Sequence, residues 1–223
     1  MNNNTIVFFS LFVLFYLIGC SGTHYTVPKE SKVLLPVEKK QKLRLVEDED
    51  QLIIKAIFLE EQGALKASSE LFASLYEKTA KSEYLLKEAS TAHQASIVPK
   101  HLSELEAYSL KNPKNFQAQR LLLSFYLKEK ALNKAKKMGN KLIENSNQAV
   151  DFELAANPYI FAGDYQKSVN YLEEAYRKTL NEDILLKIIT IKINYLNDVA
   201  SAINDLERHK TEQGCSEKIC LQL

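Results

Sequence analysis

A period of 33 or 34 residues is the feature that most constrains how this chain of 223 residues folds. From Asp50 onward, apolar residues recur at three- and four-residue steps, as on one face of an amphipathic helix, and no strand-like alternation of useful length follows. One position, small in four of five copies, marks the period. Its occupants are Ser68, His101, Ala135, Ser168 and Ala202. Because each copy leaves an apolar face that only the next copy covers, the period predicts an all-α stack of repeats.

Two further positions keep the same phase. Twelve residues before the marker we expect the packing position of a first helix, where small side chains allow close helix approach. This position holds Ala56, Ala89, Leu123, Ala156 and Thr190. Between the two helices we expect a turn whose left-handed backbone ends the first helix. The turn position holds Gly63, Ser96, Lys130, Gly163 and Asn197.

Four residues fit the period poorly. His101 and Thr190 are large for small positions, and Gly139 stands where a large apolar residue is expected. Pro158 lies inside an expected helix, where it removes a hydrogen bond and should kink the helix. A helical bundle without repeats is therefore the alternative reading of this region.

The clearest copy reads Gly-Asp-Tyr-Gln-Lys-Ser-Val-Asn-Tyr-Leu-Glu-Glu-Ala-Tyr at residues 163–176. It resembles the turn and second helix of a tetratricopeptide repeat (TPR). The resemblance covers residues 49–212 and implies a TPR-like α-solenoid of about five helix-turn-helix units. In that family the groove lined by the first helices binds extended peptides or partner helices. Carried over by position, the partner-binding groove includes Ser90, His93, Arg120, Ser124, Glu153, Asn157 and Asn194, with Arg120 and Asn157 the strongest candidates to grip a peptide.

The first twenty residues predict where in the cell the protein is located. Residues 6–18 form an apolar run of thirteen residues, which is too short to span about 30 Å of hydrocarbon and suits a secretory signal. The run ends in Leu-Ile-Gly-Cys at residues 17–20, which resembles a bacterial lipobox. The resemblance implies that residues 1–19 are a lipoprotein signal peptide and that Cys20 is lipidated. No lysine or arginine precedes the run, so an uncleaved anchor with an incidental cysteine is the alternative.

Residues 20–48 are predicted to be the lipidated cysteine followed by a basic linker. The linker ends at the acidic cluster of residues 47–50. A solvated spacer and a segment resting on anionic lipid are both compatible with this composition. Ser21 is not the aspartate that retains many lipoproteins in the inner membrane. We therefore expect a lipid anchor in the outer membrane of a bacterial cell envelope, with the chain facing the periplasm.

Cys215 and Cys220 remain once Cys20 is lipidated. In an oxidising compartment two such cysteines are normally bonded. We expect a disulfide that closes the tail at residues 213–223 against the last helix, although the spacing also permits bonding between chains or free thiols.

The sequence lacks the common motifs for metal binding, nucleophilic catalysis and phosphate binding. No two histidines lie three or four residues apart, so the common two-ligand zinc spacing is absent, and no nucleophile or phosphate-loop motif occurs. A net charge of +1 leaves no global field for nucleic acid. Six lysines between Lys128 and Lys141 form a solvated face or a site for an acidic partner or lipid headgroup. We expect no cofactor, no metal, no small-molecule substrate and no enzymatic activity.

Taken together, these features favour a scaffold or assembly factor that binds protein partners in the cell envelope and the membrane through Cys20. A structural accessory subunit of a motility or secretion machine is the second hypothesis. A cell-wall enzyme with an unrecognised site is the third.

Overall fold

The computed structural model describes residues 37–214 and 216–221. These residues form helices and connecting turns, and none of them lies in a β-strand. The expected signal peptide, the lipidated Cys20 and one member of the expected disulfide, Cys215, lie outside the described residues. The chain divides into two compact units, residues 1–41 and 42–223, and the repeat stack belongs to the second.

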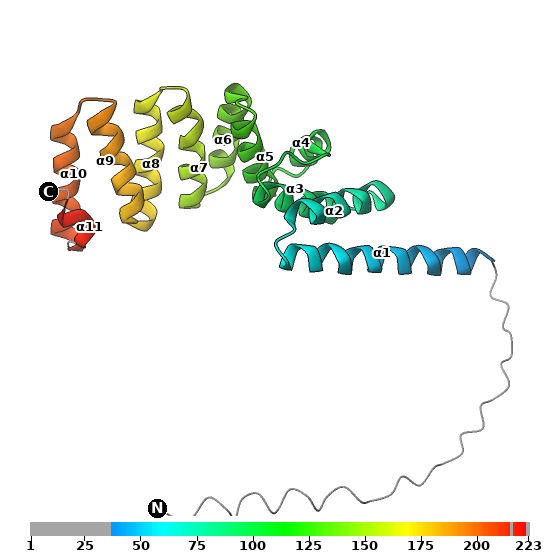
Figure 1. The fold of residues 1–223 in the computed structure, drawn as a ribbon. Helices are drawn as coiled ribbons and strands as arrows, with labels where there is room; N and C mark the ends of the chain where they lie inside the picture. The colour runs from blue at the N-terminus through cyan, green and yellow to red at the C-terminus, as the bar shows by residue number, and fades with distance from the viewer. Residues whose placement is uncertain (1–36, 215, 222–223) are drawn as a thin grey trace, which may run out of the picture. The chain divides into compact units, whose positions relative to one another are not determined.

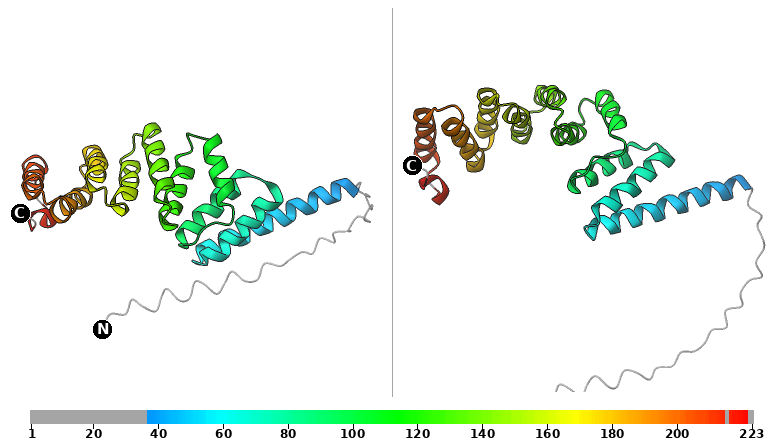
Figure 2. Two further views of the ribbon diagram at one scale, coloured as in Figure 1. Left: turned by 90° about the horizontal axis from the view of Figure 1, so that it is seen from above. Right: turned by 45° about the horizontal axis from the view of Figure 1, so that its top comes forward.

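Five antiparallel helix pairs follow one another in chain order (Figure 1), which confirms the all-α, TPR-like solenoid. The first helices of the pairs are α1 (Val37–Glu61), α3 (Ser82–Gln94), α5 (Phe116–Lys128), α7 (Ala149–Phe161) and α9 (Glu182–Asn194). The second helices are α2 (Leu65–Thr79), α4 (Leu102–Lys111), α6 (Leu132–Asn145), α8 (Tyr165–Thr179) and α10 (Val199–Gln213). A short helix, α11 (Glu217–Cys220), ends the described chain. From α2 to α10 each helix packs on the next, and the first helix α5 also contacts the first helices α3 and α7. The turned views in Figure 2 show the same succession of helix pairs.

The turns within the pairs adopt the backbone that the sequence predicts. All five turn positions have positive φ: Gly63, Ser96, Lys130, Gly163 and Asn197. At Lys130, with φ of 57°, the amide donates to the Leu127 carbonyl at 3.1 Å, and the next amide, that of Ala131, donates to the Tyr126 carbonyl at 2.8 Å. These bonds satisfy carbonyls that the end of a helix leaves without partners.

The core forms where the period places small side chains. Ala56, Ala135 and Ser168 are fully buried. Ser68 is buried too, and its hydroxyl donates to the Ala56 carbonyl at 2.8 Å, so the packing position of α1 and the marker position of α2 meet directly. The first, third and fourth pairs therefore pack through the residues that the period identifies.

Two of the poorly fitting residues have a structural reason. An ideal Cβ on Gly139 would lie 3.2 Å from the Ala155 Cα, so glycine permits the close approach of α6 and α7. His101 does not occupy a helical packing position, because it is the N-terminal capping residue of α4 and pairs with a buried carboxylate. Helix α7 continues past Pro158 to Phe161.

Two expectations about helix positions are wrong. Thr190 is exposed, and its hydroxyl donates to the Leu186 carbonyl at 2.7 Å, while the neighbouring Ile188 and Ile189 are buried in its place. Helix α1 begins at Val37 rather than at residue 49, so residues 37–48 of the expected linker are helical. That stretch is rich in lysine, glutamate and leucine, which favour helix, and Pro36 stands directly before it.

The tail after α10 packs onto the stack. Ile219 of α11 is fully buried and belongs to the core cluster formed by α8, α9 and α10. The Ser216 hydroxyl donates to Glu182 at 2.6 Å, and Lys218 pairs with Asp183 at 3.0 Å. Because Cys215 is not described, the disulfide between Cys215 and Cys220 stays a prediction.

Candidate partner-binding surface

The seven residues expected to line a groove all lie on first helices of the repeats. Ser90 and His93 are on α3, and Arg120 and Ser124 are on α5. Glu153 and Asn157 are on α7, and Asn194 is on α9. None of the seven is buried. We call the face of α3, α5, α7 and α9 that carries these seven residues the first-helix surface.

Three positions of each first helix build this surface. Relative to the small packing residue, they lie three residues before it, one after it and four after it, which is one face of an α-helix. In α7 the packing residue Ala156 is fully buried, and the three positions hold Glu153, Asn157 and Ile160. Glu153 forms an ion pair with Lys187 of α9, so this surface also joins neighbouring first helices.

Arg120, whose expected role in gripping a peptide stays a prediction, forms an ion pair within the stack. Its Nε donates to Asp151 Oδ1 at 2.5 Å, and Nη2 donates to Asp151 Oδ2 at 2.8 Å and also to Gln148. Hydrogen bonds to Asp151 raise the pKa of Arg120. Asp151 is fully buried and also accepts the Ser146 hydroxyl. The two hydrogen bonds from the guanidinium to Asp151 thus hold α5 against α7.

Ser124 is also engaged, since its hydroxyl donates to the Arg120 carbonyl at 3.0 Å. Glu153 is engaged as well, through its ion pair with Lys187, whereas the other four residues are not hydrogen-bonded to described residues through their side chains. Ser90, Asn157 and Asn194 make no side-chain hydrogen bond with any residue that the structure describes. His93 is exposed and forms a T-shaped ring contact with Phe125, with centroids 6.1 Å apart. Four accessible polar groups therefore lie on three first helices without side-chain hydrogen bonds to described residues.

Apolar side chains separate these polar groups. Leu127 and Ile160 are half-buried four residues after the packing positions of α5 and α7, and Leu86 is half-buried three residues before the packing position of α3. An extended peptide needs both kinds of contact, because its backbone requires hydrogen-bond partners and its side chains gain affinity by leaving water. The surface offers amide, hydroxyl and imidazole groups beside aliphatic ones, which suits a peptide or helix.

Two buried polar clusters were not predicted from the sequence. Glu88, only 1% exposed, accepts the His101 backbone N–H at 3.1 Å and bonds the His101 Nδ1 at 2.7 Å, which ties α3 to α4. Lys192 pairs with Asp205 at 2.6 Å and with Glu173 at 2.9 Å, which joins α9 to α10 and α8. Their sequence signal is weak, since the partners lie 13 or more residues apart. Both clusters join neighbouring helices, and so they serve the stack.

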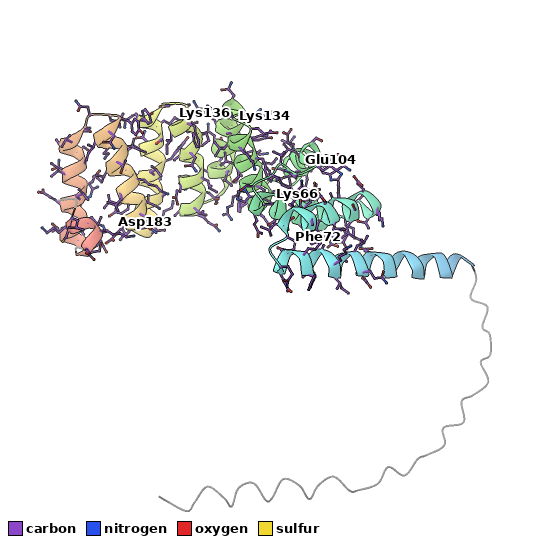
Figure 3. All side chains as sticks on the ribbon, in the orientation of Figure 1. Lys66, Phe72, Glu104, Lys134, Lys136 and Asp183 are labelled. Carbon is purple, nitrogen blue, oxygen red and sulfur yellow. The ribbon has the colours of Figure 1, made fainter. Side chains whose placement is uncertain are left out.

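The described part of the chain contains no group of three or more histidine, cysteine, aspartate or glutamate side chains placed to hold a metal ion. Nor does any described helix have the length and apolar character needed to cross a bilayer. Two surface hollows lie off the first-helix surface. One, of about 650 Å³, follows the connection from α4 to α5, and one of about 530 Å³ lies against α2, which carries Lys66 (Figure 3).

Comparison with solved structures identifies the fold. MamA from Desulfovibrio magneticus RS-1, residues 41 to the end, superposes with a TM-score of 0.63 at 10% identity, covering 73% of this chain and 93% of that one. MamA AMB-1 gives a TM-score of 0.59 at 15% identity, with 81% and 98% covered. A thermophilic TPR protein from Thermus thermophilus gives 0.52 at 13% identity, with 78% and 96% covered. No protein-family model and no curated protein matches the sequence. At these identities the comparison establishes a TPR-like fold and nothing more specific.

Proposed function

We propose that this protein is a membrane-anchored, periplasm-facing scaffold or assembly factor that holds a protein partner of the cell envelope on its first-helix surface. One observation carries the proposal: Ser90, His93, Asn157 and Asn194 are accessible on α3, α7 and α9 and make no side-chain hydrogen bond with a described residue. A TPR-like stack presents such groups at a fixed spacing, which favours an extended protein ligand over a small molecule.

Site-specific photocrosslinking tests this surface. Benzoylphenylalanine placed at Asn157 or Asn194 in the full chain, in its own host, should give a discrete crosslinked partner. Asn133 on α6 and Asn204 on α10 are matched controls, because both are exposed asparagines on second helices. Crosslinks that are equally strong at the control positions, or absent at Asn157 and Asn194, would contradict the proposal.

The anchor is the second part of the proposal and rests on the lipobox resemblance around Cys20. Several acyl chains hold a protein firmly at a membrane, because each buried CH₂ contributes about 0.8 kcal/mol. Intact mass of the membrane-extracted protein should lack residues 1–19 and gain a diacylglyceryl or triacyl group. An unmodified full-length mass would refute lipidation and reopen the assignment to the outer membrane and the periplasm. A gain of about two hydrogens on reduction would support the Cys215–Cys220 disulfide.

The alternative is a structural accessory subunit of a motility or secretion machine. A different observation favours it. Helix α1 exposes Ile54, Ile57 and Phe58 by 68%, 42% and 57%. An exposed apolar stripe of this kind marks an interaction site on many proteins. Crosslinks confined to Ile54 or Phe58 would favour this alternative over a first-helix partner.

A further inference from the structure

A small hollow lies between the second helices α4 and α6, away from the first-helix surface. It has a volume of about 220 Å³. We call it the α4–α6 hollow. Its lining residues are Glu106, Leu110, Tyr126, Lys134, Lys137, Met138 and Lys141. Neither the TPR-like stacking nor the proposed use of the first helices accounts for this combination of residues.

The wall of the hollow is basic, with three lysines and one glutamate. Lys134 projects from α6 (Figure 3), pairs with Glu106 at 3.1 Å and lies 5.2 Å from the centre of the Tyr126 ring. Lys137 and Lys141 form no ion pair with any acid that the structure describes. They lie three and seven residues after Lys134, which places all three lysines along one side of α6. Two positive charges are thus available to a ligand.

The floor of the hollow is apolar. Met138 and Tyr126 are 9% and 6% exposed, so their side chains are fixed in the core and present only a small surface. Leu110 is 68% exposed although it stands at the hollow, and no functional reason for this exposure follows from the stack. An aliphatic side chain entering the hollow would cover Leu110 and Met138 and leave water itself.

We propose that the α4–α6 hollow binds an acidic peptide segment of a partner protein, with one aliphatic anchor side chain on the apolar floor and flanking carboxylates on Lys137 and Lys141. Charge complementarity assigns the acidic character, and the volume and the exposed Leu110 assign the anchor. The proposal does not depend on the first-helix surface, because α4 and α6 are second helices of their repeats.

An anionic membrane is the competing occupant, and the geometry favours the peptide. Clusters that hold a membrane surface usually carry four to eight basic residues on an accessible face. Here two lysines without described ion-pair partners border a concave site, and Leu110 is the one strongly exposed apolar residue in its lining. A concave apolar floor suits a single inserted side chain better than a broad lipid surface.

The test uses the full, lipid-anchored chain in phosphatidylcholine nanodiscs and a defined probe. The probe is the capped pentapeptide Glu-Glu-photoleucine-Glu-Glu, and the control peptide replaces each glutamate by lysine. After irradiation, mass spectrometry should place the adducts on α4 and α6 within the lining of the hollow. Adducts spread over the whole surface, or equal labelling by the lysine peptide, would overturn the proposal.

Charge variants test whether Lys137 and Lys141 attract the acidic probe. The double substitution K137E/K141E should lower labelling by about tenfold, which corresponds to the loss of two favourable charge contacts. The control K128E/K210E makes the same change of charge at exposed lysines that form no ion pair with described residues, and it should label like the natural chain. Equal loss in both variants would mean that net charge alone attracts the probe, and the hollow would not be the site.

Leu110→Ser tests the anchor. Since Leu110 is mostly exposed, the fold should survive, and labelling should fall several-fold. Phe161→Ser, at a residue of α7 with a similar exposure of 69%, is the matched control and should not change labelling. An unchanged signal in Leu110→Ser would refute the anchor. If photoactivatable phosphatidylglycerol in the nanodisc labels the hollow and the acidic peptide does not, the occupant is lipid and the proposal fails.

Discussion

Substituting Arg120 by methionine gives the sharpest test of how the repeats are held together. The guanidinium donates two hydrogen bonds to Asp151, at 2.5 and 2.8 Å, across α5 and α7. Methionine keeps most of the aliphatic stem and removes the charge. Asp151 is fully buried, so its carboxylate stays in the interior without its main partner.

The structure sets the size of the effect. Breaking a buried ion pair from one side costs about 3–5 kcal/mol, because an uncompensated charge remains. The Arg120 side chain is 30% exposed, so water reaches part of the vacated space, and the Ser146 hydroxyl still donates to Asp151. We therefore expect a loss of about 2–3 kcal/mol. At about 2–4 °C per kcal/mol for a chain of this size, the melting temperature should fall by about 4–12 °C.

Urea unfolding followed by far-UV circular dichroism measures the difference. Asp151→Asn should cost less, about 1–2 kcal/mol, because the charge it leaves behind belongs to the partly hydrated Arg120. Arg177→Met removes an exposed pair with Glu174 and should cost less than about 0.5 kcal/mol. If Arg120→Met destabilises no more than Asp151→Asn, the buried carboxylate is not the costly member of the pair, and this reasoning is wrong.

Two further predictions concern the helix contacts. Gly139→Ala should destabilise the chain by about 1 kcal/mol in urea, since overpacking against Ala155, 3.2 Å away, outweighs the better helix propensity of alanine. Burial lowers the pKa of Lys192, but its hydrogen bonds to Asp205 and Glu173 outweigh burial and raise it above the ordinary value. The stability that Lys192 supplies is therefore complete below about pH 10.4 and is lost as pH rises through its folded-state pKa. Lys192→Met should show a smaller alkaline loss of stability than the natural chain.

The repeat phase could be predicted from the sequence because it depends on local rules. A turn that ends a helix in the left-handed region and a small residue at the helix crossing recur every 33 or 34 residues, and both are read from single positions. Even Ser96 and Lys130, which lack the freedom of glycine, adopt φ of 55° and 57° where the period places the turn. The stack imposes this conformation on residues whose own preference is weak.

The partners of individual side chains could not be predicted in the same way. Asp151 lies 31 residues after Arg120, and Lys192 meets Asp205 13 residues on. Such pairs depend on how two helices are rotated about their axes, and a shift of one residue turns a side chain by about 100°. The N-terminal end of α1 was missed for another reason, because a basic stretch that suits a linker also contains good helix formers.

The register of the first helices separates structural from partner-binding roles. Three residues before the packing position, Arg120 and Glu153 are engaged in ion pairs with Asp151 and Lys187 of the next first helices. One residue after the packing position, Asn157 makes no side-chain hydrogen bond with a described residue, and neither does Asn194 at the end of α9. A ligand that lies along the stack therefore meets the later positions, while the earlier ones keep the repeats in register. Substitutions at the two sets should separate accordingly, with stability changing at the first and partner binding at the second.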